Sequence, residues 1–360
     1  MILLFHPAPF QLEWRCVSDD GIREYAVDVE GDWPAAVLES FAAGKRVQAV
    51  GYYLHNGGDE ITEPADTLTS ETVGRLRKIV HLSPQRNQMT LQVATFAMRK
   101  WPGAAHVLFC DTAFFTRLPP AVRTYALPYE LTQTGLHRYG GSGLCHEEMW
   151  RQAQASTGGR ARKVVSGYLG DYSDLAAIQD GVPVETTLGL THLEGLMSSQ
   201  GCGEIDPTII FQLAAAGLSY PAINQLLSTQ SGFTALAGMP CGLADVLGGA
   251  GDPGLVTARR AFTYQVTRYL GAMLAVLGGV DMLIFSGERP AEIMPLVWDV
   301  CDAVSFLGVR CRREEGRIGF PRLVSAEDST VAVLVSDYSL WEAMAGHIRR
   351  MMEDHKERMR

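Results

Sequence analysis

The sequence predicts an α/β protein built from two similar domains, and two observations lead to this expectation. A plan of three β-prone runs joined by short turns occurs twice, from Ile2 to Val29 and again from Lys163 to Val184. Between and after these stretches, β-prone and helical patterns alternate, as they do in layered α/β folds. A plan repeated at the head of each half indicates two related domains facing one another, with a ligand cleft between them.

Short turns divide both copies of the plan into strands. Asp-Gly between β-prone runs is typical of a hairpin, because these residues tolerate the backbone angles of a tight turn. In the first copy we expect a strand at Ile2 to Phe5, a loop at His6 to Pro9, a second strand ending at Val17 and the turn Asp19-Asp20-Gly21. In the second copy we expect a strand at Lys163 to Val165, a loop at Gly167 to Asp171 and the turn Asp180-Gly181.

The remaining elements follow from capping residues and hydrophobic patterns. Ser, Thr or Asp before a helix, Pro in its first turn and Gly after its end mark the boundaries. These signals predict helices at 69–80, 206–217, 255–278, 295–308 and 340–360. Further β-prone segments occur at 48–54, 105–110, 282–285 and 331–335.

Composition predicts a soluble, cytoplasmic protein and argues against several classes. Of the 360 residues 47% are hydrophobic and 20% are charged, which is ordinary for a folded chain. The net charge of −9, without a basic stripe, argues against nucleic-acid binding. The longest apolar stretch, Leu270 to Val280, is too short to span a bilayer. The seven cysteines contain no C-x-x-C pair, which predicts reduced thiols rather than a zinc site.

Several segments resemble the acetate kinase (acetokinase) family, in order along nearly the whole chain. Any one of these motifs would be weak alone, whereas their agreement in order and spacing is specific. The segments are HNGGDEITEP at 55–64, DTAFFTRLPP at 111–120, YALPYEL at 125–131, HRYGGSGLCH at 137–146, THLEGLM at 191–197, GEIDPTII at 203–210, SGFTALAG at 231–238 and SFLGVR at 305–310.

The resemblance implies a fold, a reaction and a set of ligands. The fold is that of the actin-like ATPases, with two duplicated actin-like (ribonuclease H-like) domains. We expect the first at residues 1–115 closed by the C-terminal helix 339–360, and the second at 116–338. The implied reaction moves a phosphoryl group from ATP, with Mg²⁺, to a small carboxylate. The implied partners are a small carboxylate or phosphorylated metabolite and a second copy of the chain in a homodimer.

The chain departs from the family at the groups that hold the transferring phosphoryl. In the family these are two arginines and a histidine, and by motif position they fall at Tyr52, Gly201 and Ser142. Losing one such group lowers a rate by about 10²- to 10³-fold, since these groups stabilise charge in the transition state. We therefore expect little phosphorylation of acetate.

A few candidate catalytic residues remain. Asp111 matches the family's acidic residue and follows a β-prone run, so the resemblance implies that it is catalytic and holds the metal. Arg86 takes the place of a family histidine beside the retained Asn87. The alternatives are that Asp111 caps the next turn and that Arg86 is an ordinary surface arginine.

Gly170, Asp171, Gly203 and Gly287 are the candidate cofactor-binding residues. The family's phosphate loops correspond to 5–10 and 168–173, and its adenosine motif to 286–290. The first loop carries two prolines, which have no N–H for a phosphate, and the second places the Asp171 carboxylate where phosphate approaches. The segment around Gly203 is also explained as a helix start without function.

Two hypotheses therefore stay open. One is a divergent phosphotransferase of this family that acts on a larger or more polar carboxylate. The other is a catalytically inactive paralogue that binds a partner or a metabolite as a regulatory or scaffold protein. Loss of both phosphate loops favours the second hypothesis, and retention of Asp111, Asn87 and Arg86 favours the first.

Overall fold

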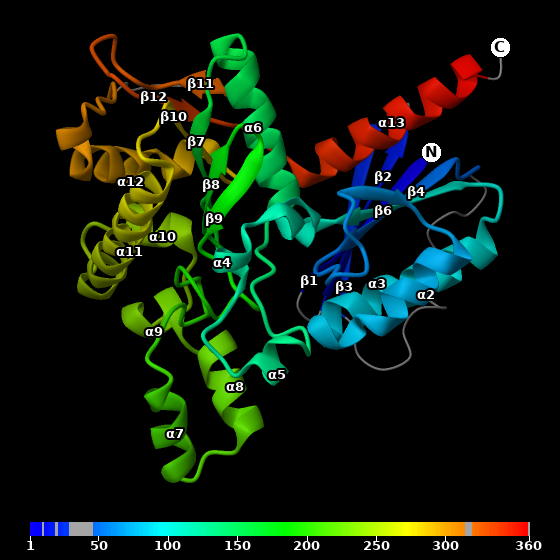
Figure 1. Ribbon diagram of the computed structural model, residues 1–360, viewed down its shortest axis with the longest axis horizontal. Coiled ribbons are helices and arrows are strands. Elements are labelled where there is room, and N and C mark those ends of the chain that lie inside the picture. The colour runs from blue at the N-terminus through cyan, green and yellow to red at the C-terminus, as the bar shows by residue number, and fades with distance from the viewer. Residues whose placement is uncertain (9–10, 19–20, 29–45, 314–318, 359–360) are drawn as a thin grey trace. The chain divides into compact units, whose positions relative to one another are not determined.

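The chain divides into two compact units, each with its own core and sheet. The computed structural model (Figure 1) describes residues 1–8, 11–18, 21–28, 46–313 and 319–358, with the side chains of 355–358 left out. The first unit comprises Met1–Thr116 together with Ser339–Arg360, and the second comprises Arg117–Tyr338.

A mixed sheet of six strands forms the centre of the first unit, in the order β3-β2-β1-β4-β6-β5. Strands β1 and β4 pair in parallel, as do β4 and β6, whereas the hairpin strands and the far edge strand are antiparallel. The strands are β1 Ile2–Ala8, β2 Gln11–Ser18, β3 Gly21–Asp28, β4 Ala49–Leu54, β5 Ala65–Thr67 and β6 Ala105–Cys110.

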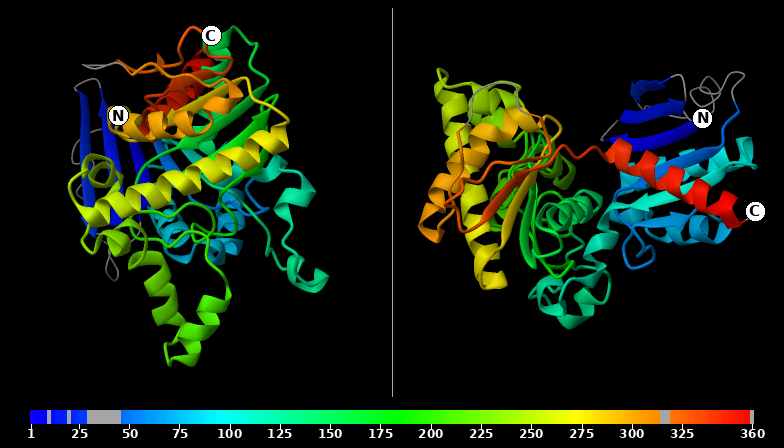
Figure 2. Two further views of the ribbon diagram at one scale, coloured as in Figure 1. Left: turned by 90° about the vertical axis from the view of Figure 1, so that its left-hand side faces the viewer. Right: turned by 90° about the horizontal axis from the view of Figure 1, so that it is seen from above.

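Helices cover both faces of this sheet (Figures 1 and 2). The helices are α2 Ser70–Lys78, α3 Pro84–Lys100 and α13 Leu340–Arg358, with short 3-10 turns η1 Val80–Leu82 and η2 Asp111–Arg117. Helices α2 and α3 lie on one face and α13 on the other. On the α3 side, Tyr52, Leu54, Met89 and Val93 share one apolar core. Successive side chains of a strand face opposite sides of the sheet. Only alternate residues of β4 can therefore contact a residue on the side away from this core.

A second sheet of six strands has the order β9-β8-β7-β10-β12-β11, which repeats the plan of the first sheet. Here too an antiparallel hairpin leads into parallel strands and ends on an antiparallel edge strand. The strands are β7 Lys163–Tyr168, β8 Asp174–Gln179, β9 Val182–Thr186, β10 Met282–Ser286, β11 Arg322–Leu323 and β12 Ala332–Val335.

The second unit carries most of the helices. Helix α11 packs on β7, β8 and β9, and α6 packs on β7 and β10 (Figure 2). The helices are α4 Pro120–Arg123, α5 Tyr129–Thr132, α6 Gly143–Thr157, α7 Thr208–Ala215, α8 Tyr220–Thr229, α9 Gly232–Ala237, α10 Leu243–Gly248, α11 Pro253–Leu277 and α12 Pro290–Ala303, with η3 Ser305–Leu307.

The duplicated hairpins are confirmed, with three corrections at strand ends. The predicted loop at Gly167 to Asp171 is wrong for residues 167–168, because β7 continues to Tyr168. Gly21, predicted as a turn residue, begins β3 and pairs with Ser18. The turn Asp180-Gly181 has φ of +50° and +78°, as a two-residue hairpin requires. The predicted loop at His6 to Pro9 is wrong for residues 6–8, because β1 continues to Ala8. Strand β4 pairs with β1 only as far as Phe5, so the following part of β1 has one free side and tolerates Pro7. Pro9, Asp19 and Asp20 lie outside the described residues.

One helix start is also corrected. Helix α12 begins at Pro290, which occupies the first turn, and Pro295 lies inside the helix rather than at its start. The expected signals at Thr69, which accepts a hydrogen bond from the amide of Thr72, and at Gly278, with φ of +61°, are confirmed. Within the described ranges, no helix is both long and apolar enough to cross a membrane.

Candidate functional site

The carboxylate of Asp111 lies at the carboxyl end of β6, in the first unit. Asp111 begins η2 directly after β6 and is 4% exposed. The hydroxyl of Tyr53, on the neighbouring strand β4, donates a hydrogen bond to this carboxylate. Burial, together with the negative charge of Asp111, raises the pKa of Tyr53 well above its ordinary value of 10.0. Tyr53 therefore holds Asp111 in place as a neutral donor.

A cation lies beside this pair. Arg86 is in the first turn of α3, and its Nη1 lies 3.1 Å from Nδ1 of His55, the residue that follows β4. The positive charge of Arg86 also acts on Tyr53, where it opposes the rise in pKa. Arg86 and Asp111 thus share Tyr53 as a neighbour, so an acidic and a basic group lie near one another at this edge of the first sheet.

The side chain of Asn87 is hydrogen-bonded to backbone groups at both of its polar atoms. Its side chain is completely buried, and its amide nitrogen donates to the carbonyls of Asn56 at 2.7 Å and Ile79 at 3.0 Å. Its side-chain oxygen accepts from the Asn56 amide at 3.3 Å. Both amide hydrogens are used, so Asn87 positions the loop after β4 and offers no donor to a ligand.

The side chain of β4 that faces Asp111 is Tyr53 and not its neighbour Tyr52. Tyr52 is fully buried on the α3 side, where its hydroxyl lies 2.7 Å from Nδ1 of His106 and its ring stacks at 6.1 Å on Phe5. Because side chains alternate along a strand, Tyr52 cannot turn toward the carboxylate that Tyr53 contacts. Tyr52, the position expected to correspond to a family arginine, therefore faces the α3 core, and Tyr53 is the β4 side chain that contacts Asp111.

In the second unit, the loop after β7 is closed by its own hydrogen bonds. The amide of Gly170 donates to the Ser173 hydroxyl at 3.0 Å, so this N–H is already occupied. The Asp171 carboxylate accepts from the Ser199 hydroxyl at 2.7 Å and from the Leu243 amide at 3.0 Å. The exposed Asp171 carboxylate thus accepts hydrogen bonds from donors of the kind that can also bind phosphate.

Gly287 and Gly203 are required by close packing of the backbone. A Cβ on Gly287 would lie 2.3 Å from the carbonyl oxygen of Leu169, in the loop after β7. A Cβ on Gly203, whose φ is +67°, would lie 2.6 Å from the amide nitrogen of Met197. Both glycines are therefore explained without a nucleotide.

The two other expected phosphoryl-holding positions carry no charge. A Cβ on Gly201 would lie 2.7 Å from the Ser198 hydroxyl, so this position has no room for a larger side chain without a local shift. Ser142 has φ of +51° and precedes α6. His146, the last residue of the family-like segment at 137–146, is fully buried between the Ser166 hydroxyl at 2.7 Å and the Asp174 carboxylate at 3.1 Å.

Asp111 is a single carboxylate rather than one of a metal cluster. Among the described residues, no group of three or more His, Cys, Asp or Glu side chains could hold a metal ion. Magnesium is commonly held by one or two carboxylates with water and substrate phosphates completing the shell, so Asp111 alone fits a role as its protein ligand.

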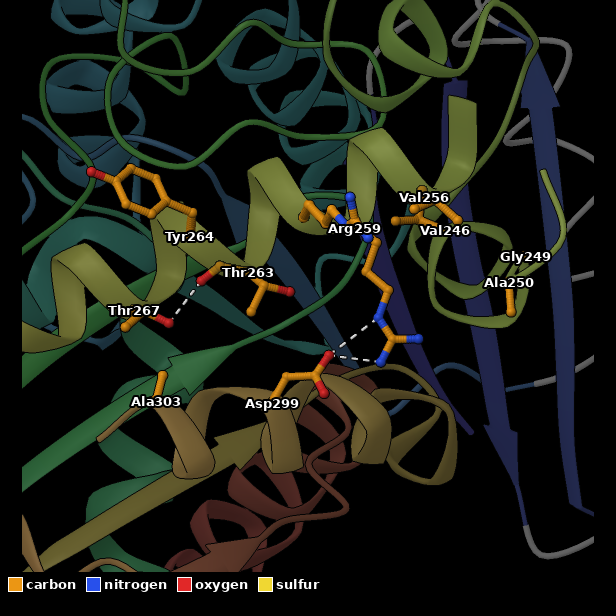
Figure 3. Close-up of a pocket in the computed structure, with 11 residues that line it drawn as sticks. Val246, Gly249, Ala250, Val256, Arg259, Thr263, Tyr264, Thr267, Asp299 and Ala303 are labelled. Atoms are coloured by element: carbon orange, nitrogen blue, oxygen red, sulfur yellow. Dashed lines mark hydrogen bonds and ion pairs between the residues drawn. The ribbon is translucent and has the colours of Figure 1, made fainter. Parts of the chain in front are cut away.

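A cavity of about 570 Å³ lies elsewhere in the second unit, among α10, α11 and α12 (Figure 3). Apolar walls surround an ion pair in which Arg259 contacts Asp299 at 2.7 Å. The lining residues are Val246, Gly249, Ala250, Val256, Arg259, Arg260, Thr263, Tyr264, Thr267, Asp299 and Ala303. None of the residues selected from the sequence lines this cavity.

Comparisons with known proteins identify the family. The model of the acetokinase family matches residues 37–339. The acetate kinase of Phocaeicola vulgatus is 29% identical over 336 residues, covering 90% of this chain and 84% of the relative. The acetate kinase of Dictyoglomus thermophilum is 33% identical over 300 residues, covering 80% and 74%.

Solved structures show the same fold. Porphyromonas gingivalis acetate kinase has a TM-score of 0.85 at 23% identity, covering 98% of this chain and 99% of that one. A propionate kinase from Francisella tularensis has a TM-score of 0.80 at 21% identity, covering 93% and 95%. The expected α/β fold with two duplicated actin-like domains is thereby confirmed. With its motifs, fold and family match in agreement, this chain belongs to the acetokinase family.

Proposed function

We propose that this chain is a divergent phosphotransferase of the acetokinase family whose acceptor is a small carboxylate other than acetate. The buried pair of Asp111 and Tyr53, with Arg86 beside it, is the observation that carries this proposal. A buried carboxylate at the carboxyl end of a strand, fixed by a neutral hydroxyl and close to a cation, suits phosphoryl transfer, in which positioning and charge stabilisation supply most of the rate.

Each residue has a distinct role in this proposal. Asp111 supplies the oxygen ligand for Mg²⁺, which when bound neutralises phosphate charge. Arg86 attracts the carboxylate of the acceptor or the oxygens of the phosphoryl group, and Tyr53 keeps Asp111 oriented. In the reaction, a carboxylate oxygen of the acceptor attacks the γ-phosphorus of ATP, the bond to the β,γ-bridging oxygen breaks, and ADP leaves with that electron pair. Asn87 acts through the loop that it holds.

We expect weak activity on acetate, because the positions that carry cations in the family hold tyrosine, glycine and serine here. The test is a hydroxamate assay for acyl phosphate with ATP and Mg²⁺, over acetate, propionate and larger or more polar carboxylates. On the best acceptor, Asp111→Asn is expected to lower the rate by about 10²- to 10³-fold.

Asp66→Asn is the matched control, since Asp66 lies on the edge strand β5 and pairs at 2.9 Å with Arg75. It should leave the rate unchanged. No acyl phosphate from any acceptor, or equal loss in both variants, would contradict the proposal.

A second function is favoured by the closed loop after β7: an inactive paralogue that binds a metabolite or protein as a regulatory or scaffold component. The Asp171 carboxylate and the occupied Gly170 amide support it. A thermal-shift screen with ATP, ADP, pyrophosphate and short carboxylates, with and without Mg²⁺, separates the two, because a ligand of the folded state raises its stability. If Arg86→Ala and Asp111→Asn respond to every ligand as the parent does, this second function is supported.

We also propose a cytoplasmic homodimer, supported by the likeness to acetate kinases. Sedimentation velocity over a range of concentrations tests the dimer. A mass of one chain at all concentrations would contradict it.

A further inference from the structure

Two cysteines that are separate in the sequence meet in the second unit. Cys301 is in the last turns of α12 and is 1% exposed, whereas Cys311 is partly exposed and lies at an isolated bridge to Ser325. The two thiols lie close enough for each to affect the pKa of the other, and Cys311 packs against the core that contains Cys301. Both are free thiols.

Further contacts join the same two segments in the same alignment. Arg313, two residues after Cys311, forms an ion pair with Asp302, the residue after Cys301. The guanidinium of Arg313 also lies 6.0 Å from the centre of the Trp298 ring, on the preceding turn of α12. Arg313 therefore holds residues 311–313 against α12 through contacts that do not involve the two thiols.

The two thiols differ in reactivity. The interaction with the Cys301 thiol lowers the pKa of Cys311, against the opposing effects of burial and of the Asp302 charge. The same interaction, with burial, raises the pKa of Cys301. Since the thiolate is the reactive form and Cys311 is also the more exposed of the pair, an oxidant meets Cys311 first and Cys301 second.

We propose that Cys301 and Cys311 form an oxidation site that converts reversibly between two thiols and a disulfide, with a peroxide as the oxidant. The Cys311 thiolate attacks one oxygen of the peroxide, the O–O bond breaks, and Cys311 becomes a sulfenic acid while hydroxide leaves with hydrogen peroxide as the oxidant. The Cys301 sulfur then attacks the Cys311 sulfur, and the sulfenic hydroxyl leaves as water with the proton of Cys301. Two thiols and one hydrogen peroxide thus give one disulfide and two waters.

The disulfide would fasten the segment that follows α12 to the last turns of that helix. It closes residues 301–311 into a ring that contains η3, where Phe306 is 80% exposed. Helix α12 itself starts at Pro290, shortly after the Gly287 turn that packs on the loop after β7. Oxidation therefore restrains the segment that follows α12.

The test is treatment of the folded, full-length protein with hydrogen peroxide, followed by digestion and mass spectrometry without reductant. We expect a linked peptide containing Cys301 and Cys311 that is lighter by two hydrogens than its two reduced parts, and that a thiol reductant separates. The linkage should form before Cys202 is modified, because burial raises the pKa of the Cys202 thiol.

Three variants make the test specific. Cys311→Ser, at a partly exposed position, should abolish the linked peptide, and Cys241→Ser, a buried control in the same unit, should keep it. Cys301→Ser should leave a Cys311 sulfenic acid that dimedone traps. Should Cys301→Ser fail to fold, Cys311→Ser still decides the matter. Oxidation of Cys202 or Cys311 without any Cys301–Cys311 linkage in the folded protein would overturn the proposal.

Discussion

The two units share one strand order but differ in the polar side chains that lie at the carboxyl ends of their central strands. In the first unit, charged side chains lie there, with the buried Asp111 after β6 and the half-buried Arg86 against the residue that follows β4. In the second unit, the loop after β7 places there a carboxylate, Asp171, that accepts hydrogen bonds from the Ser199 hydroxyl and the Leu243 amide. The first unit therefore keeps the chemistry of a site, and the second keeps mainly its architecture.

Packing at the equivalent turns explains how both plans stay intact. Gly57 follows β4 and Gly287 follows β10, the strand in the equivalent place, and a Cβ on either would lie 2.3 Å from a neighbouring atom. The first turn is held by the side chains of Asn87 and Thr112, through hydrogen bonds to Asn56 and Gly57. The second is held by close approach to the Leu169 backbone. Duplication thus preserves the tight turn and changes what supports it.

Removing the support of the first turn should have the largest effect on stability. Asn87→Ala deletes three hydrogen bonds and leaves the amide and carbonyl of Asn56 and the carbonyl of Ile79 buried without that partner. We expect a loss of about 3 kcal/mol in the free energy of unfolding, measured by urea denaturation. Gln88→Ala, on the exposed side of the same helix, should change it by less than about 0.5 kcal/mol. A small loss from Asn87→Ala would mean that the turn is held by its backbone, as in the second unit.

Removing the internal carboxylate of the second unit should have a smaller effect. Asp171→Ala loses bonds to the Ser199 hydroxyl and the Leu243 amide, and because Asp171 is exposed we expect a cost of about 1 to 2 kcal/mol rather than the full value of a buried charge. We also expect pyrophosphate to stabilise this variant more than the parent. In the variant the Asp171 carboxylate no longer competes with pyrophosphate for the Ser199 hydroxyl and the Leu243 amide. The exposed Asp328→Ala is the control. Equal responses to pyrophosphate would show that Asp171 does not close the loop against phosphate.

The duplication and the family were predictable from the sequence because turns and motifs are local. The side of a strand on which a single side chain lies was not predictable from the sequence. Motif position points to Tyr52, whereas the side chain of β4 that contacts Asp111 is that of Tyr53, because neighbouring side chains of a strand face opposite sides. The commitment of Asn87 to the Asn56 backbone depends on contacts between separate segments. The meeting of Cys301 and Cys311 likewise requires the fold, since their spacing matches no thiol motif.

The buried hydroxyl of Tyr53 should make the first unit sensitive to alkaline pH. The pKa of Tyr53 is raised in the folded state, so below about pH 10 both states hold the proton and stability does not change on its account. Above that pH the unfolded chain loses the proton while the folded chain keeps it, so stability falls by up to about 1.4 kcal/mol per pH unit.

Tyr53→Phe should reduce this fall, whereas Tyr129→Phe, at a 72% exposed residue, should not. The measurement is urea denaturation at several values from about pH 9 to 11. Identical slopes for Tyr53→Phe and the parent would show that the Tyr53 proton does not contribute to the alkaline loss of stability.

The two hairpins that open the units should respond alike and weakly to a change of glycine. Gly181 has φ of +78° and Gly21 has φ of +119°, and both are unfavourable for a residue with a Cβ. A Cβ on Gly21 meets nothing within 4 Å, whereas one on Gly181 would make a tight contact, 3.2 Å from Nε1 of Trp150, which a small shift of that ring relieves. We therefore expect Gly181→Ala and Gly21→Ala each to cost about 1 kcal/mol in urea denaturation.

Gly74→Ala is the matched control, because Gly74 lies inside α2 with nothing within 4 Å of its Cβ position. There alanine should stabilise by about 0.5 to 1 kcal/mol. If the free energy of unfolding falls for Gly181→Ala and not for Gly21→Ala, the two hairpins differ in how much their glycines contribute to stability, although their strand pairing and order are alike.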